Sequence, residues 1–439
     1  MTMTPQEEWK KNVEDYAGAI NAFVENGLKY GFENAGPEPE HPDCEHLVTH
    51  AIEAVREANG NGTVSTLREL WPPAHQPLIP VLEDSGQSIP NLCLLDDGTI
   101  IARIGTEYQD GHVVQIQGDQ VETIPDLQFF GQSPDGRYFA TSCLEGVLVT
   151  DGWMGEHVCL CSWPTGIEDL PDGADVVPFD GIPAPSQLIP FPNGQRVLLV
   201  SSDGIFVLSR GGARRLIPTD EAVTEWIKYL KEEEPDDEIT LPDVSMAHGA
   251  VSRDGKWIAV GCQDSKHLIY NEDLELVAKV GHLSEYPHYA LFNTDSSMVA
   301  FNSCHFYNGV TIGVPTNLLP GLSTESYEED ERFPVLEGGA RVYAGTCRKG
   351  DFIIGDAGGY VRAVSETGEV LWQHFIGSSI GDIVISRDGK TLVVSTYAGF
   401  IAIIDLDAGD APAYRIGSGN QVERRRWIFW KNEDKPLMW

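Results

Sequence analysis

Residues 386–409, SRDGKTLVVSTYAGFIAIIDLDAG, decide the fold of this chain. A turn at Asp388-Gly389 is followed by a run of apolar and β-branched residues, TLVVSTY, and then by a second such run, FIAIIDL. Asp-Gly supplies the positive φ angles that a tight hairpin needs, and β-branched residues favour strands. The segment therefore predicts antiparallel strands joined by tight turns.

The same pattern occurs seven times, which carries more weight than any single copy. The turns are Asp97-Gly98, Asp135-Gly136, Asn193-Gly194, Asp254-Gly255, Asp295-Ser296, Lys349-Gly350 and Asp388-Gly389. A hairpin of this size cannot bury its own faces, and hairpins that recur every ~40 to 50 residues indicate sheets stacked in a ring. We therefore predict an all-β fold, a seven-bladed β-propeller, with a small N-terminal helical element.

The propeller is expected over residues 77–420. Its blades are expected at 89–126, 127–166, 183–219, 244–280, 282–322, 333–376 and 378–417. In the last blade, APAYRIG (411–417) is expected to form the fourth strand. The segment PGLSTESYEEDERFP (320–334) is expected as an insertion between the fifth and sixth blades.

Two segments before the propeller place apolar residues at helical spacing. They are residues 5–33 and 43–58, and with a linker at 59–76 they make an N-terminal extension over residues 1–76. Their apolar stripes could pack on the ring or on a partner, and the ring is the favoured alternative. A further helical stripe begins an acidic insertion at about 220–243. Such insertions often build a binding surface, and a solvated loop is the alternative.

The C-terminal tail, residues 421–439, has an unusual composition. Its segment ERRRWIFWKNEDKPLMW (423–439) contains three Arg and three Trp residues in a very acidic chain. It could be a strand that closes the ring, with Arg424 to Arg426 paired to acidic groups, or an exposed recognition tail. Trp is rarely left in water, so closure of the ring is favoured.

The formal net charge of −37 limits the classes of partner. Binding to nucleic acid or anionic lipid depends on Lys and Arg, so neither is expected here. A basic protein partner fits the charge, because attraction would speed association. A solvated acidic surface without a partner is the alternative. The chain by itself is expected to be a monomer.

Cysteine usage and hydropathy indicate the cytoplasm. Several of the eight cysteines fall in expected strands, where a free thiol behaves as a small buried hydrophobe. The sequence opens with MTMTPQEEWKK, which has no secretory pattern, and no apolar stretch approaches the ~20 residues that span a bilayer.

Two segments resemble known propeller repeats. Residues 352–375, FIIGDAGGYVRAVSETGEVLWQHF, resemble a quinoprotein-type repeat, and residues 386–409 resemble the unit of bacterial WD-repeat and YVTN-type propellers. Ser133-Pro134-Asp135-Gly136 and Ser252-Arg253-Asp254-Gly255 share the opening of that second unit. The resemblance implies a propeller fold and leaves the activity open, because these folds host many functions. The full quinoprotein pattern occurs in one blade, so no cofactor is expected.

Candidate binding residues lie in the loops after each second strand and before each first strand, which share one face of a propeller. They are His248, Asp264, Tyr286, His288, His305, Phe306, Tyr307, Asp356 and Tyr397. Aromatic residues among acidic ones suit a protein interface, although such aromatics can also seal blade against blade. We expect no metal site, because paired Cys/His spacing is missing, and no catalytic residue, because no nucleophile motif occurs.

These features together suggest a non-enzymatic, acidic propeller scaffold that binds a protein. A sharper form of this hypothesis is an immunity or antitoxin-like protein that neutralises a cationic toxin. The alternative is a cytosolic propeller hydrolase such as a sugar lactonase. That activity would need His248, His288 or His305 to converge with carboxylates at the channel mouth.

Overall fold

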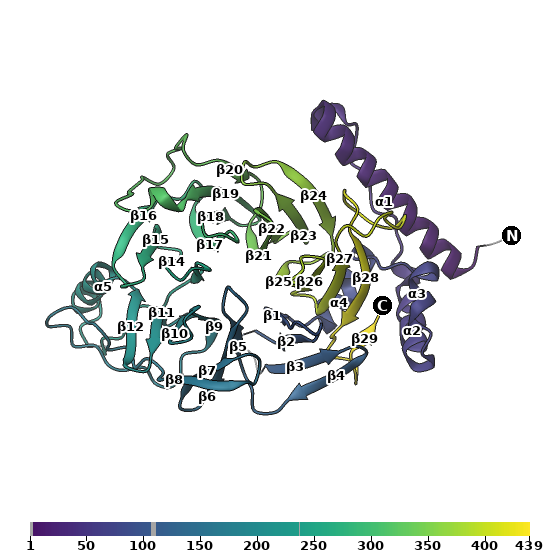
Figure 1. Cartoon of the computed structure of the whole chain (residues 1–439). Coiled ribbons are helices and arrows are strands. Elements are labelled where there is room, and N and C mark those ends of the chain that lie inside the picture. Colours follow the sequence, from purple (N-terminus) through teal and green to yellow (C-terminus); the bar gives the residue numbers. More distant parts are fainter. Residues whose placement is uncertain (1–2, 107–110, 237) are drawn as a thin grey trace.

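The computed structural model describes residues 3–106, 111–236 and 238–439. It confirms the seven-bladed β-propeller, with seven antiparallel sheets arranged around a ring (Figure 1). Each sheet consists of consecutive strands, so every blade is built from one continuous stretch of chain. Six sheets have four strands and the last has five.

Blades 1 to 4 place their first strands inward and their fourth strands at the rim. The second strand of blade 1, β2, is buried at every position, whereas its fourth strand, β4, is mostly exposed. The strands are β1 (Asn91–Leu94), β2 (Ile100–Ile104), β3 (His112–Gln117), β4 (Gln120–Ile124), β5 (Phe130–Gln132), β6 (Tyr138–Cys143), β7 (Gly146–Asp151), β8 (Glu156–Cys161), β9 (Pro185–Pro190), β10 (Arg196–Ser201), β11 (Gly204–Ser209), β12 (Gly212–Ile217), β13 (His248–Val251), β14 (Trp257–Gly261), β15 (His267–Asn271) and β16 (Leu276–Val280).

Blades 5 to 7 complete the ring. Their strands are β17 (Tyr286–Phe292), β18 (Met298–His305), β19 (Asn308–Pro315), β20 (Val335–Glu337), β21 (Val342–Arg348), β22 (Asp351–Asp356), β23 (Tyr360–Val364), β24 (Val370–Phe375), β25 (Ile380–Ile385), β26 (Thr391–Thr396), β27 (Phe400–Asp405), β28 (Val422–Ile428) and β29 (Leu437–Met438). The short 3₁₀ helix η4 (Thr316–Leu318) follows β19.

The Ser-x-Asp-Gly turns are held by the serine hydroxyl. In blade 7, Ser386 Oγ donates to Asp388 Oδ1 at 2.7 Å and accepts from the Thr391 N–H at 2.9 Å, where β26 begins. Ser133 and Ser252 make the same two hydrogen bonds in blades 2 and 4. The hydroxyl thus satisfies backbone and carboxylate groups at each strand start, as in other Ser- and Asp-nucleated turns.

Two expected blade boundaries are wrong. The fourth strand of blade 5 is β20, so the insertion at 320–334 lies inside that blade, between its third and fourth strands. The fourth strand of blade 7 is β28, and the segment APAYRIG lies in the loop before it. The entropic cost of closing a loop grows only slowly with its length. The fourth strand of a blade can therefore come from a segment further along the chain if that segment pairs better.

The N-terminal helices lie beside the last blade (Figure 1). The first begins at a capping box in which Thr4 and Glu7 satisfy each other's backbone N–H groups. The segment expected as a linker contains a third helix. The helices are α1 (Pro5–Tyr30), η1 (Phe32–Asn34), η2 (Glu45–Leu47), α2 (Val48–Asn61), α3 (Val64–Leu70), η3 (Gln76–Leu78) and α4 (Ile79–Ser85).

Four tryptophans join these helices to the C-terminal tail. Trp9, Trp71, Trp430 and Trp439 belong to one buried cluster, each at most 8% exposed. The indole N–H groups of Trp9, Trp430 and Trp439 donate to backbone carbonyls; Trp439 Nε1, for example, donates to Trp71 O at 2.7 Å. Burial with a satisfied N–H is the state in which Trp contributes most to a core.

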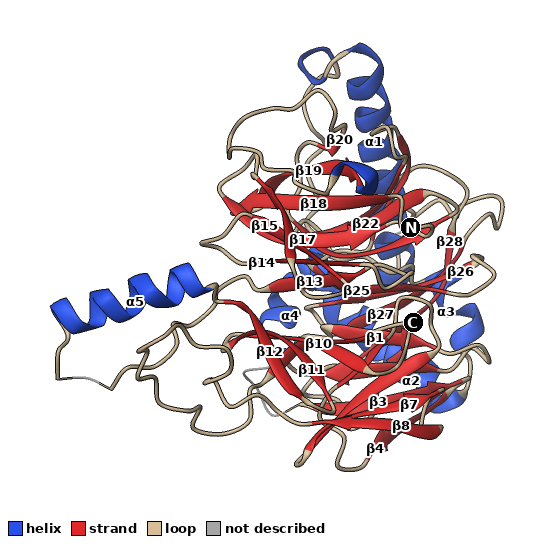
Figure 2. Ribbon diagram, turned by 60° about the vertical axis from the view of Figure 1, so that its left-hand side comes forward, coloured by secondary structure: helices blue, strands red, loops and turns tan. Residues whose placement is uncertain are grey.

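The acidic insertion forms an arm. Helix α5 (Asp220–Glu233) extends away from the ring, as Figure 2 shows. Its residues Val223 and Ile227 pack with Val176 and Leu241 from neighbouring loops in a small separate cluster. The arm is tied to blade 3 by the buried Arg215, which donates to Asp169 O at 2.7 Å and to Asp220 Oδ1 at 2.8 Å.

No helix within residues 3–106, 111–236 and 238–439 combines enough length with enough apolar sequence to cross a bilayer.

Candidate functional site

The β18–β19 hairpin presents two of the predicted binding residues at its tip. His305 pairs with Asn308, so Phe306 and Tyr307 form a two-residue loop. Their side chains are 74% and 73% exposed. Phe306 has a φ of 53°, in the left-handed region where the first loop position usually holds Gly. An aromatic residue there is a conformational outlier, and outliers of this kind cluster at functional sites.

Arg341 supports this hairpin from the neighbouring blade. Its backbone N–H donates to Tyr307 O at 3.0 Å, and its Nη1 donates to Phe306 O at 3.3 Å. Its Nε and Nη2 donate to His288 Nε2 at 3.2 and 3.0 Å. The imidazole in turn donates from Nδ1 to Val342 O at 2.7 Å. Both ring nitrogens of His288 therefore make hydrogen bonds, and one of them fixes the position of Arg341, which supports the loop.

Protonation of His288 is disfavoured at neutral pH. Burial, followed by the adjacent Arg341 cation, lowers the pKa of His288 to about 3. The neutral ring can accept from Arg341, which a charged ring could not do. His288 thus positions the hairpin.

A second group of predicted residues surrounds the hairpin. His305 pairs with Glu285, and its ring meets that of Phe306 edge-on at 4.4 Å. Glu285, with smaller effects from Tyr327 and Asp264, raises the pKa of Tyr286, which places these groups near one another. Asp264 is exposed and Tyr286 half-buried.

The loop that carries Tyr327 reaches this face from the long insertion of blade 5. The Tyr327 backbone N–H donates to His282 O at 2.8 Å. The Tyr327 ring, 65% exposed, lies edge-on to the His282 ring at 5.1 Å. We call this surface the blade 5 patch. It consists of Asp264, Glu285, Tyr286, His305, Phe306, Tyr307 and Tyr327.

The remaining predicted residues have structural contacts. His248 is 2% exposed, with Nδ1 3.0 Å from Met246 O and Nε2 3.4 Å from His267 Nδ1. Burial lowers its pKa to about 4. Asp356 is 3% exposed, pairs with Arg362 and accepts from the Tyr360 N–H at 2.9 Å.

Tyr397 is half-buried on blade 7, and its ring meets that of Tyr343, on blade 6, at 5.7 Å. The three histidines proposed for hydrolysis have different contact partners, although His248 lies near enough to His288 to lower its pKa. His248 contacts His267, His288 contacts Arg341, and His305 contacts Glu285. Within residues 3–106, 111–236 and 238–439, no group of three His, Cys, Asp or Glu side chains could hold a metal ion.

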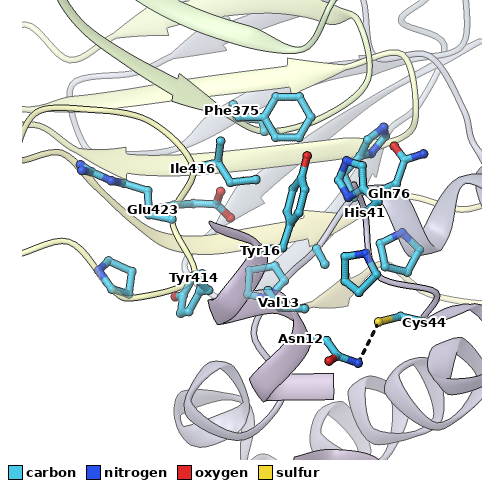
Figure 3. Close-up of a pocket in the computed structure, with 18 of the residues that line it drawn as sticks. Asn12, Val13, Tyr16, His41, Cys44, Gln76, Phe375, Tyr414, Ile416 and Glu423 are labelled. Atoms are coloured by element: carbon cyan, nitrogen blue, oxygen red, sulfur yellow. Dashed lines mark hydrogen bonds between the residues drawn. The ribbon is translucent and has the colours of Figure 1, made fainter. Parts of the chain in front are cut away.

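A cavity that sequence reasoning missed lies where the N-terminal helices meet blades 6 and 7. Its volume is about 60 Å³, and Figure 3 shows Val13, Tyr16, His41, Phe375 and Glu423 gathered around it. The lining also includes His75, His374, Ile376, Tyr414, Arg415, Ile416 and Arg426. No local motif could reveal the cavity, because its walls come from opposite ends of the chain.

The chain was compared with known proteins by sequence. No protein-family model matches it, and no curated protein matches it. Its function must therefore follow from its fold and from the geometry of its surfaces.

Proposed function

We propose that this protein is an acidic propeller scaffold that binds a basic protein through the blade 5 patch. The observation that carries the proposal is the hairpin tip, where Phe306 and Tyr307 are 74% and 73% exposed on a loop held by Arg341. Rigid, exposed aromatics are the residues that most often dominate the binding energy of protein interfaces.

The hairpin is prepared for binding before any partner arrives. A left-handed φ at a non-glycine residue costs roughly 1–2 kcal/mol, and Phe306 adopts it here. The support from Arg341 limits the motion of the loop, so little conformational entropy remains to be lost on association. Both features favour a recognition loop over a passive surface turn.

The charge around the aromatics selects the partner. Asp264 and Glu285 lie in the patch, and the loop of Tyr327 continues through Glu328 and Glu329. With a net charge of −37 on the whole chain, a basic protein would be attracted at long range and then held by the aromatic tip. An immunity or antitoxin-like role against a cationic toxin is the particular form of this function that we propose.

We further propose that the protein acts in a bacterial cytoplasm and belongs to the WD-repeat or YVTN-type group of propellers. All eight cysteines are free thiols, which suits a reducing compartment. The repeat unit at 386–409 supports the assignment to that group.

The test uses a variant that removes both rings and preserves the hairpin. Phe306→Gly combined with Tyr307→Ser places Gly at the first loop position, where the φ is positive, and a small polar residue at the second. Leu144→Asn is the matched control, because Leu144 is 84% exposed in the β6–β7 turn of blade 2. Wild type, double variant and control would each be used to capture proteins from lysate of the source organism, at low and at high salt.

We expect wild type and Leu144→Asn to retain the same basic protein at low salt and the double variant to lose it. Retention should fall with salt, because screening weakens attraction between exposed charges. Equal retention by the double variant, or capture of no basic protein by wild type at low salt, would refute the proposal.

A further inference from the structure

The cavity beside the N-terminal helices has a cationic floor. Glu423 is contacted by two guanidinium groups: Arg68 Nη2 donates to its Oε1 at 2.6 Å, and Arg426 donates from Nε and Nη2 at 2.9 and 2.8 Å. All three side chains are nearly or fully buried. One carboxylate between two guanidiniums leaves an excess of one positive charge.

A third guanidinium adds to this excess at the cavity wall. Arg415 donates to the carbonyl oxygens of Gly419, Gln421 and Gly417. Burial lowers its pKa. Among the residues that the structure describes, Arg415 has no ion pair. The nearby Glu38 is exposed and acts on His41 and Tyr16 at the outer side.

Three lining side chains also carry buried nitrogen atoms that lack a hydrogen-bond partner among the described residues. They are His75 Nδ1, both ring nitrogens of His374, and Arg415 Nε. His374 is 4% exposed, and its Nε2 lies 3.7 Å from Glu423 Oε2, beyond hydrogen-bond distance. Buried polar groups in folded proteins are nearly always paired, so each of these requires an explanation.

The tautomer of His75 can be assigned. Its Nε2 accepts from the Ser378 N–H at 3.2 Å, so the proton is on Nδ1 and that nitrogen is a donor. Burial, followed by Arg426, lowers the pKa of His75 to about 4, which keeps the ring neutral at pH 7. The wall of the cavity therefore has an excess of donors as well as an excess of positive charge.

Part of the cavity wall is apolar. Val13, Tyr16, Phe375, Ile376 and Ile416 line it, and Tyr16 stacks on His41 at 3.8 Å. A volume of about 60 Å³ holds roughly four to six water molecules at ~10–15 Å³ each. Water would satisfy the donors without offsetting the charge, whereas a small anion would do both.

We propose that this cavity binds a small organic monocarboxylate of about two to four carbon atoms. Its carboxylate would accept from His75, His374 and Arg415 beside the Arg68–Glu423–Arg426 cluster. Its alkyl part would lie against Val13 and Ile376. The site is independent of the blade 5 patch and is formed jointly by the N-terminal helices and the last two blades.

The decisive experiment measures binding to the full-length protein by calorimetry and thermal unfolding. The probes are acetate, propionate and butyrate at constant ionic strength, with propionamide as the neutral match and inorganic phosphate as the competing anion class. We expect saturable binding of at least one carboxylate and no binding of propionamide. Binding of phosphate alone, equal binding of propionamide, or no binding of any carboxylate would overturn the proposal.

A variant locates the binding. His374→Leu removes a buried imidazole that makes no hydrogen bond, at similar volume, so unliganded stability should stay about equal while carboxylate affinity falls at least tenfold. His157→Leu, at an exposed position of β8, is the matched control and should bind as wild type does. Unchanged affinity in His374→Leu would refute this location. Should that variant fail to fold, Val13→Trp, which fills the cavity from α1, must abolish binding.

Discussion

The carboxylate of Asp382 in β25 accepts a 2.7 Å hydrogen bond from the backbone N–H of Leu92 in β1. The bond joins the last blade to the first, across the seam where the ring closes. Asp382 is partly buried, and burial raises its pKa to about 6. Above about pH 6 Asp382 is therefore ionised in a buried position, which lowers the stability of the folded state.

Replacement of Asp382 by Asn should remove this cost. A folded-state pKa above the unfolded value means that stability is highest below about pH 4 for this group and falls as pH rises to about 6. The shift corresponds to about 3 kcal/mol, or roughly 1–2 kcal/mol after allowance for partial exposure. Asp382→Asn should therefore be about 1–2 kcal/mol more stable than wild type at pH 7.5, with little difference at pH 4.

Urea unfolding at several pH values would measure this difference. Asp151→Asn, at a partly exposed surface carboxylate that pairs with Arg137, is the control for a general loss of negative charge. A pH profile of Asp382→Asn parallel to that of wild type would contradict the prediction.

The buried cluster of Arg68, Glu423 and Arg426 should respond unequally to removal of its members. Glu423→Gln leaves two buried guanidiniums without a counter-charge and should cost about 3–5 kcal/mol. Arg68→Met keeps the Glu423–Arg426 pair and fills similar volume, so it should cost less. Chemical denaturation gives both values. A larger loss for Arg68→Met than for Glu423→Gln would show that the excess positive charge is wrongly assigned.

The tail should contribute to stability through Trp439. The side chain is 2% exposed, and its indole donates to Trp71 O at 2.7 Å. Trp439→Ala should destabilise the protein by about 3–5 kcal/mol, the usual loss for a buried aromatic. Trp226→Ala, on the half-buried face of the arm helix α5, is the comparison and should cost clearly less. Equal thermal unfolding of the two variants would argue against a stabilising role of the tail.

The strain at the hairpin tip predicts opposite effects at two turn positions. Phe306→Gly should raise stability by about 0.5–1 kcal/mol, because Gly adopts a φ of 53° without the Cβ penalty. Gly389→Ala, at a φ of 70° in the Asp-Gly turn of blade 7, should lower stability by about 1 kcal/mol. Denaturation midpoints measure both. A destabilised Phe306→Gly would mean that the ring is needed for the fold.

The candidate patch could be predicted only in part. Phe306 and Tyr307 are evident as exposed aromatics, because they interrupt two strands in the loop after a second strand. The partners of His288, His248 and Asp356 could not be anticipated, because Arg341, His267 and Arg362 contact them only once the blades are in place. Because of these contacts, His288, His248 and Asp356 have structural roles.

The sequence by itself determined the number of blades and the positions of most strands, because Asp-Gly turns and β-branched runs act through local geometry. Tertiary structure alone decided that β20 and β28 complete their sheets after long loops, since strand pairing is chosen by hydrogen bonding across distance. Tertiary structure also determined where the cationic cavity forms. His75 and Ser378 stand 303 residues apart and meet only because the N-terminal helices pack against the ring, which no local pattern encodes.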